Sequence, residues 1–277
     1  MKANNYILKI LLLALMFIGV SDLSAQQSDA QQDLQQLIEA VKVKIQGGAQ
    51  DAEGLADELA QFDALLLKYA DNRSDDVAEI LFMKAMLYVQ LLKDPDTAIA
   101  LMEKLQVEFP ESEQAKKSDK VIQSIKDYAA SLQIQRSLVE QGMFPAFAVN
   151  DLEGEPLSLD QYKGKVVLID FWATWCGPCI NELPNVLQAY TKYHKDGFDI
   201  IGISLDKDRN KLTQFIQKEK MPWRQYFDGQ GWQNSLAKKY GVNSIPATYL
   251  LDGEGRIIGV DLRGSALEDA VASALAQ

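Results

Sequence analysis

The pattern of apolar residues changes near residue 142, and this change limits the chain to a two-part architecture. Over residues 26–141, apolar residues recur at the spacing of one helix face, and strand signals are lacking. From Gly142 onward, short apolar runs of strand length alternate with amphipathic stretches of helix length. The sequence therefore predicts an all-helical domain over 26–141. It predicts an α/β domain over 142–277, with helices on both faces of a sheet.

Turn signals divide the helical half into about five helices. They are Gly47-Gly48, Asn72-Arg73-Ser74, Asp94-Pro95-Asp96 and Phe109-Pro110. Asp94 is placed as an N-cap, with Pro95 at the first helical position. The segment 77–92 is apolar on nearly all sides, so we expect a helix there at the centre of the first core.

The α/β half shows strand and helix signals in alternation. Strands are expected over 147–149, 166–172, 198–204, 247–251 and 257–260, and helices over 180–194, 210–220, 233–240 and 265–276. Ser265 and Glu268 form a capping box at the start of the last helix. The turn over 252–255 joins the last two strands into a hairpin, so the sheet is expected to be mixed.

The first 25 residues have the character of a secretory signal. Lys2 and Lys9 flank the start of an apolar run over 10–20, and the small-residue ending Leu23-Ser24-Ala25 follows. The run has 11 residues, short of the roughly 20 that a membrane-spanning helix needs. No cysteine follows it, which excludes a lipidated bacterial N-terminus. We expect cleavage after Ala25 and a secreted, periplasmic protein, membrane-anchored if the signal is uncleaved.

Charge and cysteine content exclude several classes of function. Lys and Arg number 28 against 39 Asp and Glu, a net charge of −11, which argues against binding to nucleic acid or to an anionic membrane surface. Two cysteines are too few for a multi-disulfide framework or a four-cysteine metal site. A zinc site would need two further ligands, but the only histidine is His194, so we expect no metal.

Both cysteines lie in the motif FWATWCGPC over 171–179, where an apolar strand ends and a helix begins. Cys176 is expected just outside the helix and Cys179 in its first turn, where free N–H groups lower the pKa of the first thiol. The second thiol can then attack the mixed disulfide made by the first. Gly177 is expected to permit the tight turn. Pro178 is expected at the start of the helix, where an N–H would have no intrahelical partner, so that its missing N–H costs no hydrogen bond. The motif predicts thiol–disulfide exchange; a permanent structural disulfide is the alternative.

The segment 144–179 resembles the thioredoxin superfamily and, within it, the TlpA/ResA-type extracytoplasmic thiol–disulfide oxidoreductases. The resemblance runs from Phe144 to the C-terminus, 134 residues, and includes Pro184, the strand IIGISLD and Ile245-Pro246. In this family the proline before the penultimate strand is cis and lies against the cysteine pair. The resemblance therefore implies a cis Ile245-Pro246 bond, which would leave the backbone of Ile245 free to pair with an extended substrate peptide.

Asp170 interrupts an otherwise apolar strand, where an unpaired carboxylate is costly and its pKa should rise. Thioredoxins carry an aspartate at the matching place, so the resemblance implies that Asp170 assists deprotonation of Cys179 in a reducing pair. A solvent-facing Asp170 is the alternative. Glu182 recurs in TlpA-like sequences, and its role is open between tuning the thiols and a solvated helix position. Trp175 is expected to flank the site and contact substrate.

In the helical half, the run 78–112 resembles the tetratricopeptide-like helical pairs of bacterial envelope proteins. A weak internal echo appears at an offset of about 40 residues, near the period of such repeats. Helical pairs of this kind present a groove to a peptide or partner, and the alternative is an arm that packs on itself or dimerises.

Together these features predict an extracytoplasmic protein disulfide reductase that uses the Cys176–Cys179 dithiol and no other cofactor. Its expected partners are protein thiols and disulfides, and a protein partner or second copy at the helical domain. The resemblance also implies a membrane thiol–disulfide electron donor. Three alternatives stay open: a disulfide oxidase or isomerase on the same fold, a non-catalytic helical scaffold, and a peroxiredoxin-like peroxidase. The peroxidase pattern wants Thr or Ser where Ala173 stands.

Overall fold

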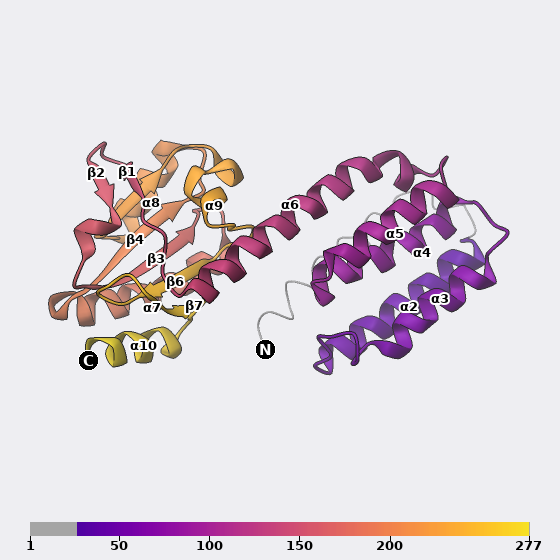
Figure 1. The fold of residues 1–277 in the computed structure, drawn as a ribbon, viewed down its shortest axis with the longest axis horizontal. Helices are drawn as coiled ribbons and strands as arrows, with labels where there is room; N and C mark the ends of the chain where they lie inside the picture. Colours follow the sequence, from indigo (N-terminus) through magenta and orange to yellow (C-terminus); the bar gives the residue numbers. More distant parts are fainter. Residues whose placement is uncertain (1–26, 277) are drawn as a thin grey trace. The chain divides into compact units, whose positions relative to one another are not determined.

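The computed structural model describes residues 27–276, so the signal expected over 1–25 lies outside the described residues. The chain divides into two compact units between Ala129 and Ala130. This point lies within the long helix α6 (Glu113–Gln141), so the last turns of α6 belong to the C-terminal unit (Figure 1). Within residues 27–276, no helix has both the length and the apolar character needed to cross a bilayer.

The N-terminal unit is helical throughout its described part, as predicted. It contains α2 (Asp29–Gln46), α3 (Ala56–Lys68), α4 (Asp75–Leu87), α5 (Pro95–Glu108) and the first part of α6. The start of α5 confirms the predicted cap: the Asp94 carboxylate accepts the N–H of Thr97 at 3.0 Å, and Pro95 is the first helical residue. Ser28 caps α2 in the same way, accepting the N–H of Gln31 at 3.2 Å.

Helix α4 supplies much of the N-terminal core, as its apolar surface predicts. Seven of its apolar residues are 5% exposed or less: Val77, Ala78, Ile80, Leu81, Met83, Ala85 and Leu87. The expected helix over 77–92 is not continuous, because α4 ends at Leu87 and a π-helical turn (Tyr88–Leu92) follows. Lys93 then takes a left-handed conformation, with φ of 54°, directly before the Asp94 cap.

The C-terminal unit is built on a five-stranded sheet with the strand order β5-β4-β3-β6-β7. Four strands have the predicted bounds: β3 (Val166–Trp172), β4 (Phe198–Ser204), β6 (Ala247–Leu251) and β7 (Ile257–Val260). β3 pairs in parallel with β4 and antiparallel with β6, while β6 pairs antiparallel with β7. The predicted mixed sheet is confirmed.

The edge strand β5 (Arg224–Phe227) is not among the predicted strands, because it opens with two polar residues that conceal the strand pattern. Those polar residues have specific partners. Gln225 lies over Gly202 of β4, where any Cβ would overlap its side-chain amide, and its Oε1 accepts the indole N–H of Trp172 at 3.0 Å. The glycine thus makes room for a buried polar contact to β3.

A short hairpin precedes the main sheet, where the sequence predicts a single strand over 147–149. Its strands are β1 (Ala148–Asn150) and β2 (Pro156–Ser158), paired antiparallel. Arg224 of β5 holds the hairpin turn, since its Nε donates to Asp151 at 2.8 Å. The second strand has only three residues and begins with proline, which explains why no strand signal stands out there.

Helices cover both faces of the sheet, as predicted. On one face, Asp170 and Trp172 of β3 lie toward α7 (Gly177–Tyr193), α8 (Arg209–Glu219) and α10 (Ser265–Leu275). On the opposite face, Phe171 packs against the rings of Tyr249 and of Tyr240, which directly follows α9 (Ser235–Lys239). Side chains alternate across a strand, so Asp170 and Phe171 necessarily point to different layers.

The predicted capping box at the start of α10 is wrong. The N-cap of α10 is Gly264, and the structure shows no side-chain cap there. Glu268 instead accepts a hydrogen bond from Lys192 of α7 at 2.5 Å. The helix start is held from another element: the Glu182 carboxylate of α7 accepts the N–H of Gly264 at 2.7 Å.

Candidate active site

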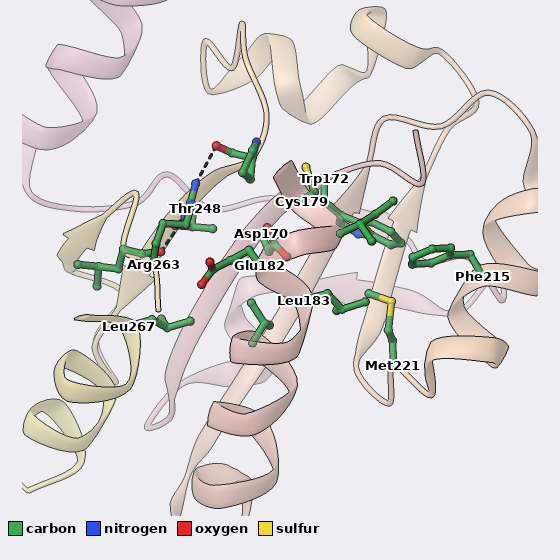
Figure 2. A pocket seen from close by; sticks show the side chains of 14 residues that line it. Asp170, Trp172, Cys179, Glu182, Leu183, Phe215, Met221, Thr248, Arg263 and Leu267 are labelled. Atoms are coloured by element: carbon green, nitrogen blue, oxygen red, sulfur yellow. Dashed lines mark hydrogen bonds between the residues drawn. The ribbon is translucent and has the colours of Figure 1, made fainter. Parts of the chain in front are cut away.

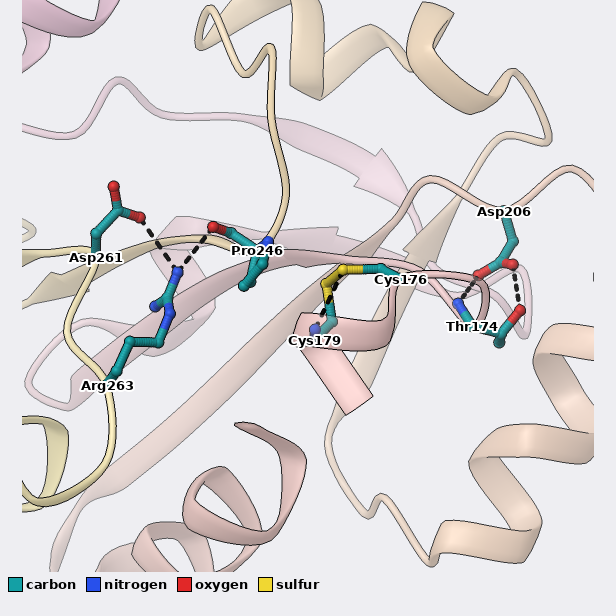
Figure 3. The surroundings of a disulfide bond; sticks show 7 residues. All are labelled: Thr174, Cys176, Cys179, Asp206, Pro246, Asp261 and Arg263. Atoms are coloured by element: carbon teal, nitrogen blue, oxygen red, sulfur yellow. Dashed lines mark hydrogen bonds and ion pairs between the residues drawn. A yellow bond between two sulfur atoms is a disulfide. The ribbon is translucent and has the colours of Figure 1, made fainter. Parts of the chain in front are cut away.

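Cys176 and Cys179 form a disulfide where β3 gives way to α7 (Figure 3). Cys176 is the N-cap of α7 and Cys179 lies in its first turn, as predicted, and both are buried. The N–H of Cys179 lies 3.2 Å from Sγ of Cys176. In the reduced protein, this backbone donor and the start of α7 favour negative charge on the Cys176 sulfur.

Gly177 and Pro178 are the first two residues of α7. Pro178 stands where a helix N–H lacks an intrahelical partner, as predicted. The turn role predicted for Gly177 is wrong, because its backbone is helical and a Cβ at this position would meet nothing within 4 Å. A side chain at this position would extend into open space.

The loop before the cysteines is anchored by Asp206, a buried residue just after the end of β4. Its carboxylate accepts the N–H of Thr174 at 3.0 Å and the Thr174 hydroxyl at 2.6 Å. Ser204 donates to the same carboxylate at 2.9 Å. Because β3 and β4 are parallel, their carboxyl ends meet at one edge of the sheet, which brings Asp206 to the cysteine loop.

The peptide bond Ile245–Pro246 is cis, as the resemblance implies. Arg263 holds this segment: its Nη2 donates to the carbonyl oxygen of Pro246 at 2.8 Å, and its Nη1 donates to Oγ1 of Thr248 at 2.8 Å. Figure 3 shows Pro246 between the disulfide and the Arg263 guanidinium, with Asp261 on the far side of Arg263. Within the described residues, no hydrogen bond occupies the backbone of Ile245.

Asp170 is buried, with 8% of its surface exposed, which excludes the solvent-facing alternative. Burial raises the pKa of Asp170 to about 7; the Arg263 guanidinium acts to lower it and the Glu182 carboxylate to raise it. Figure 2 shows Asp170, Glu182 and Arg263 around one cavity with Cys179. The predicted rise in the pKa of Asp170 is confirmed.

The cavity beside Asp170 is small, about 10 Å³, which is room for about one water molecule. Its polar groups come from β3, β6, α7 and the segment after β7. Apolar side chains line the rest, among them Trp172, Leu183, Phe215, Met221 and Leu267. Glu182 is half-buried on this cavity and bonded to Gly264. It is therefore not a solvated helix position.

Two tryptophans lie exposed at the rim of the site. Trp175, directly before Cys176, is 53% exposed, and Trp232, in a 3-10 turn (Gly231–Gln233), is 44% exposed. Their ring centroids are 5.9 Å apart, with the ring planes at 59°. Trp172, which also precedes the cysteines, is buried in the core instead.

The structure brings all the predicted site residues to one end of the sheet, and it adds three that sequence reasoning missed: Asp206, Arg263 and Trp232. An aspartate two residues after the end of the apolar strand β4 was a usable signal for Asp206, since parallel strand ends often carry functional groups. Arg263 and Trp232 have no comparable signal, because their partners are distant in the sequence.

Comparison with known proteins finds a family match that lies within this C-terminal unit, and relatives of the chain. Residues 141–260 match the model of the AhpC/TSA family. Thiol-disulfide oxidoreductase ResA of Bacillus thuringiensis subsp. konkukian (strain 97-27) is 35% identical over 114 residues, 41% of this chain and 64% of ResA. ResA of Geobacillus thermodenitrificans (strain NG80-2) is 32% identical over 113 residues, 41% of this chain and 63% of that protein. The chain thus spans less than two thirds of the length of these relatives.

Among solved structures, the chain is similar to the thioredoxin domain of a thiol-disulfide oxidoreductase from Bacteroides vulgatus. The two sequences are 33% identical, the TM-score is 0.44, and the match covers 47% of this chain and 94% of that one.

Proposed function

We propose that the protein is a thiol–disulfide oxidoreductase with Cys176 and Cys179 as its dithiol, from the premise that its C-terminal unit is an AhpC/TSA-type thioredoxin-like domain with ResA homologues. One observation carries the proposal: the cysteine pair opens α7 beside a cis proline and a buried aspartate. The cysteine pair is itself the redox group, and the proposal includes no other cofactor.

In the proposed reaction, the Cys176 thiolate attacks one sulfur of a substrate disulfide. The S–S bond breaks, a mixed disulfide forms, and the departing substrate sulfur takes up a proton. The Cys179 thiolate then attacks the Cys176 sulfur, which releases the second substrate sulfur as a thiol and closes the Cys176–Cys179 bond. Two electrons and two protons pass from the dithiol to the substrate, so one turnover needs no further reactant.

Asp170 is the proposed proton acceptor for Cys179. Both residues line the same cavity, and a carboxyl with a pKa of about 7 can take up a proton near neutral pH and release it again. The resemblance to thioredoxins includes both Asp170 and the Gly177-Pro178 dipeptide. Both features therefore support the reducing direction. An oxidase or isomerase is the competing function on the same residues.

The proposed substrates are protein disulfides in extended segments. The backbone of Ile245 is available for pairing with such a segment, and Arg263 holds the neighbouring Pro246 carbonyl in place. Gly177, next to Cys176, has no side chain, and the place that a Cβ would take there is open space. Trp175 and Pro178 complete the proposed contact surface around Cys176.

The N-terminal features support a wider proposal about location and partners. A secretory signal over 1–25 would place the protein in the periplasm, so a membrane thiol–disulfide donor would have to re-reduce the pair. We assign to the helical unit, with its tetratricopeptide-like pattern, the binding of a protein partner or a second copy. The net charge of −11 does not favour nucleic acid as a partner.

The direction of exchange is tested by the equilibrium potential of the cysteine pair. The protein is equilibrated in buffered dithiol/disulfide mixtures, and the reduced fraction is read from alkylation mass. A potential near that of thioredoxin, about −270 mV, supports a reductase. A value well on the oxidising side overturns the reducing direction and favours an oxidase or isomerase.

The exchange itself is tested by trapping. Cys179→Ser removes the attacking thiol of the second step, so mixed disulfides through Cys176 should accumulate and be identified by mass spectrometry. The matched variant Cys176→Ser should trap far less. Purely non-covalent partners with Cys179→Ser would favour the scaffold alternative, and consumption of hydrogen peroxide by the parent protein would favour a peroxidase.

A further inference from the structure

Trp175 and Trp232 form a pair of exposed aromatic side chains beside the disulfide. Tryptophan carries a large apolar ring that proteins usually bury for the most part. Here two rings lie against each other, 5.9 Å between centroids, and each is about half exposed. Exposed apolar surface of this kind marks a site of interaction.

The loop that carries Trp232 is held firmly although its ring is exposed. The Asp228 carboxylate accepts the N–H of Gln230 at 3.0 Å and that of Ser235 at 2.8 Å. Asn234, which is fully buried, donates to Asp228 at 3.1 Å and to the carbonyl oxygen of Ser204 at 3.3 Å. The backbone around Trp232 is therefore tied to the end of β4.

The loop that carries Trp175 is tied to the same strand end. Asp206 follows Ser204 by two residues, and its carboxylate holds both the N–H and the hydroxyl of Thr174. The two loops that carry the tryptophans are thus both held by hydrogen bonds at the end of β4. A preorganised aromatic pair loses little conformational entropy on binding, which favours tight contact with a partner.

We propose that Trp175 and Trp232 form a binding site for an apolar side chain that lies next to the reacting cysteine in an extended polypeptide substrate. The inference rests on the proposed function and gives it a substrate class. Trp175 directly precedes the attacking Cys176, and an extended chain advances about 3.3 Å per residue. A side chain one or two residues from the substrate cysteine therefore falls within reach of the rings.

A polypeptide is the occupant that the chemistry favours. The net charge of −11 opposes adsorption of the pair to an anionic bilayer. Tryptophan is also over-represented among the residues that dominate protein–protein binding energies. Trp232 is thereby assigned a role in specificity, at a position that takes no part in the exchange of electrons.

The test compares two peptides, each a dimer linked through a single cysteine, with Phe or Ser directly before that cysteine. The pre-reduced protein is mixed with each peptide, the reaction is quenched with acid, and the rate constant is read by chromatography. The ratio of the two rate constants measures side-chain preference and cancels any general change in thiol reactivity. The parent protein should prefer the Phe peptide by about fivefold to thirtyfold.

In Trp232→Ala this ratio should fall close to one, and Trp232→Phe should retain most of it. The matched control is Ile258→Ala, where an apolar side chain is 44% exposed. It lies on the edge strand β7, which β6 separates from β3 and the cysteine loop; its ratio should equal that of the parent. Circular dichroism shows whether each variant is folded, and Trp232→Gln serves if Trp232→Ala is not.

A parent protein that reduces both peptides at equal rates overturns this inference alone. The same holds if the ratio survives in Trp232→Ala or falls equally in Ile258→Ala. If the parent reduces hydroxyethyl disulfide, a small substrate with no neighbouring side chain, but neither peptide, this inference alone is overturned. If it reduces neither the peptides nor hydroxyethyl disulfide, the proposed function is overturned and this inference with it.

Discussion

The guanidinium of Arg263 donates to the carbonyl oxygen of Pro246 at 2.8 Å, and it is also the positive charge that counters the buried carboxyl of Asp170. One side chain thus links the segment proposed to bind substrate with the group proposed to move the proton. The register of the sheet makes this possible, because Asp170 of β3 lies opposite Thr248 of β6, which Arg263 also contacts.

Replacing Arg263 should affect binding and proton transfer separately. Arg263→Gln loses the donor to Pro246, so KM for a peptide disulfide should rise about fivefold, the equivalent of one hydrogen bond. It also removes the positive charge facing Asp170, while Glu182 remains, so the pKa of Asp170 should rise further. The rate increase that depends on this carboxylate should then move to higher pH.

Arg263→Lys distinguishes the two effects, because lysine keeps the charge but cannot bridge Pro246 and Thr248 with a planar fork. Its pH profile should stay near that of the parent, while KM rises. Arg256→Gln is the matched control, since Arg256 is exposed and pairs with Glu254 and Asp252 at the hairpin turn. Unchanged KM and pH profile in Arg263→Gln would contradict the assigned role.

Asp170→Asn should remove a pH dependence near neutrality. In the parent, the reduction of a peptide disulfide should accelerate as pH rises through about 7, because the ionised carboxylate can accept the proton of Cys179. In Asp170→Asn this increase in rate with pH should be absent, and the rate at pH 8 should be about 10- to 100-fold lower than that of the parent. Asp160→Asn, at an exposed carboxylate, is the control. A profile of Asp170→Asn that superimposes on the parent would remove Asp170 from the mechanism.

The same substitution should stabilise the fold at high pH. The pKa of Asp170 is 3.8 in the unfolded chain and about 7 in the folded protein, so the folded state binds the proton more tightly. The stability contributed by the protonated carboxyl is complete below pH 3.8 and is lost as pH rises to about 7.

Asparagine does not ionise, so the free energy of unfolding of Asp170→Asn should gain about 3–4 kcal/mol on the parent between pH 4 and pH 8. Urea unfolding followed by tryptophan fluorescence measures this, because Trp172, Trp175, Trp223 and Trp232, the four tryptophans of the chain, all lie in the C-terminal unit. If the free energies of unfolding of the two proteins differ by the same amount at pH 4 and at pH 8, the raised pKa of Asp170 is refuted.

Asp206→Ala should destabilise the C-terminal unit strongly. The substitution leaves the N–H and hydroxyl of the half-buried Thr174, and the hydroxyl of the buried Ser204, without their acceptor. The expected loss is about 2–4 kcal/mol, again read from tryptophan fluorescence in urea. Asp160→Ala removes only a surface ion pair with Lys163 and should cost at most about 0.5 kcal/mol. Similar losses in the two variants would show that the anchor is unimportant.

The sequence alone was sufficient for the features that depend on neighbours along the chain. The bounds of β3, β4, β6 and β7, the Asp94 cap and the place of Cys176 and Cys179 at a helix start all follow from local periodicity and capping. The burial of Asp170 was also predictable, because a single carboxylate within an apolar strand has no solvent-facing side. The turn role of Gly177 and the capping box at Ser265 were predicted wrongly, because each local motif is compatible with more than one backbone conformation.

Only the tertiary structure decided which distant side chains meet. Arg263 reaches Pro246, Asp206 reaches Thr174, and Trp232 lies against Trp175 across 57 positions of sequence. Strand β5 became visible only through its pairing with β4 and the space above Gly202. The physical reason is that such contacts depend on strand order and register, which arise from packing of the whole sheet, whereas periodicity and caps are set within a few residues.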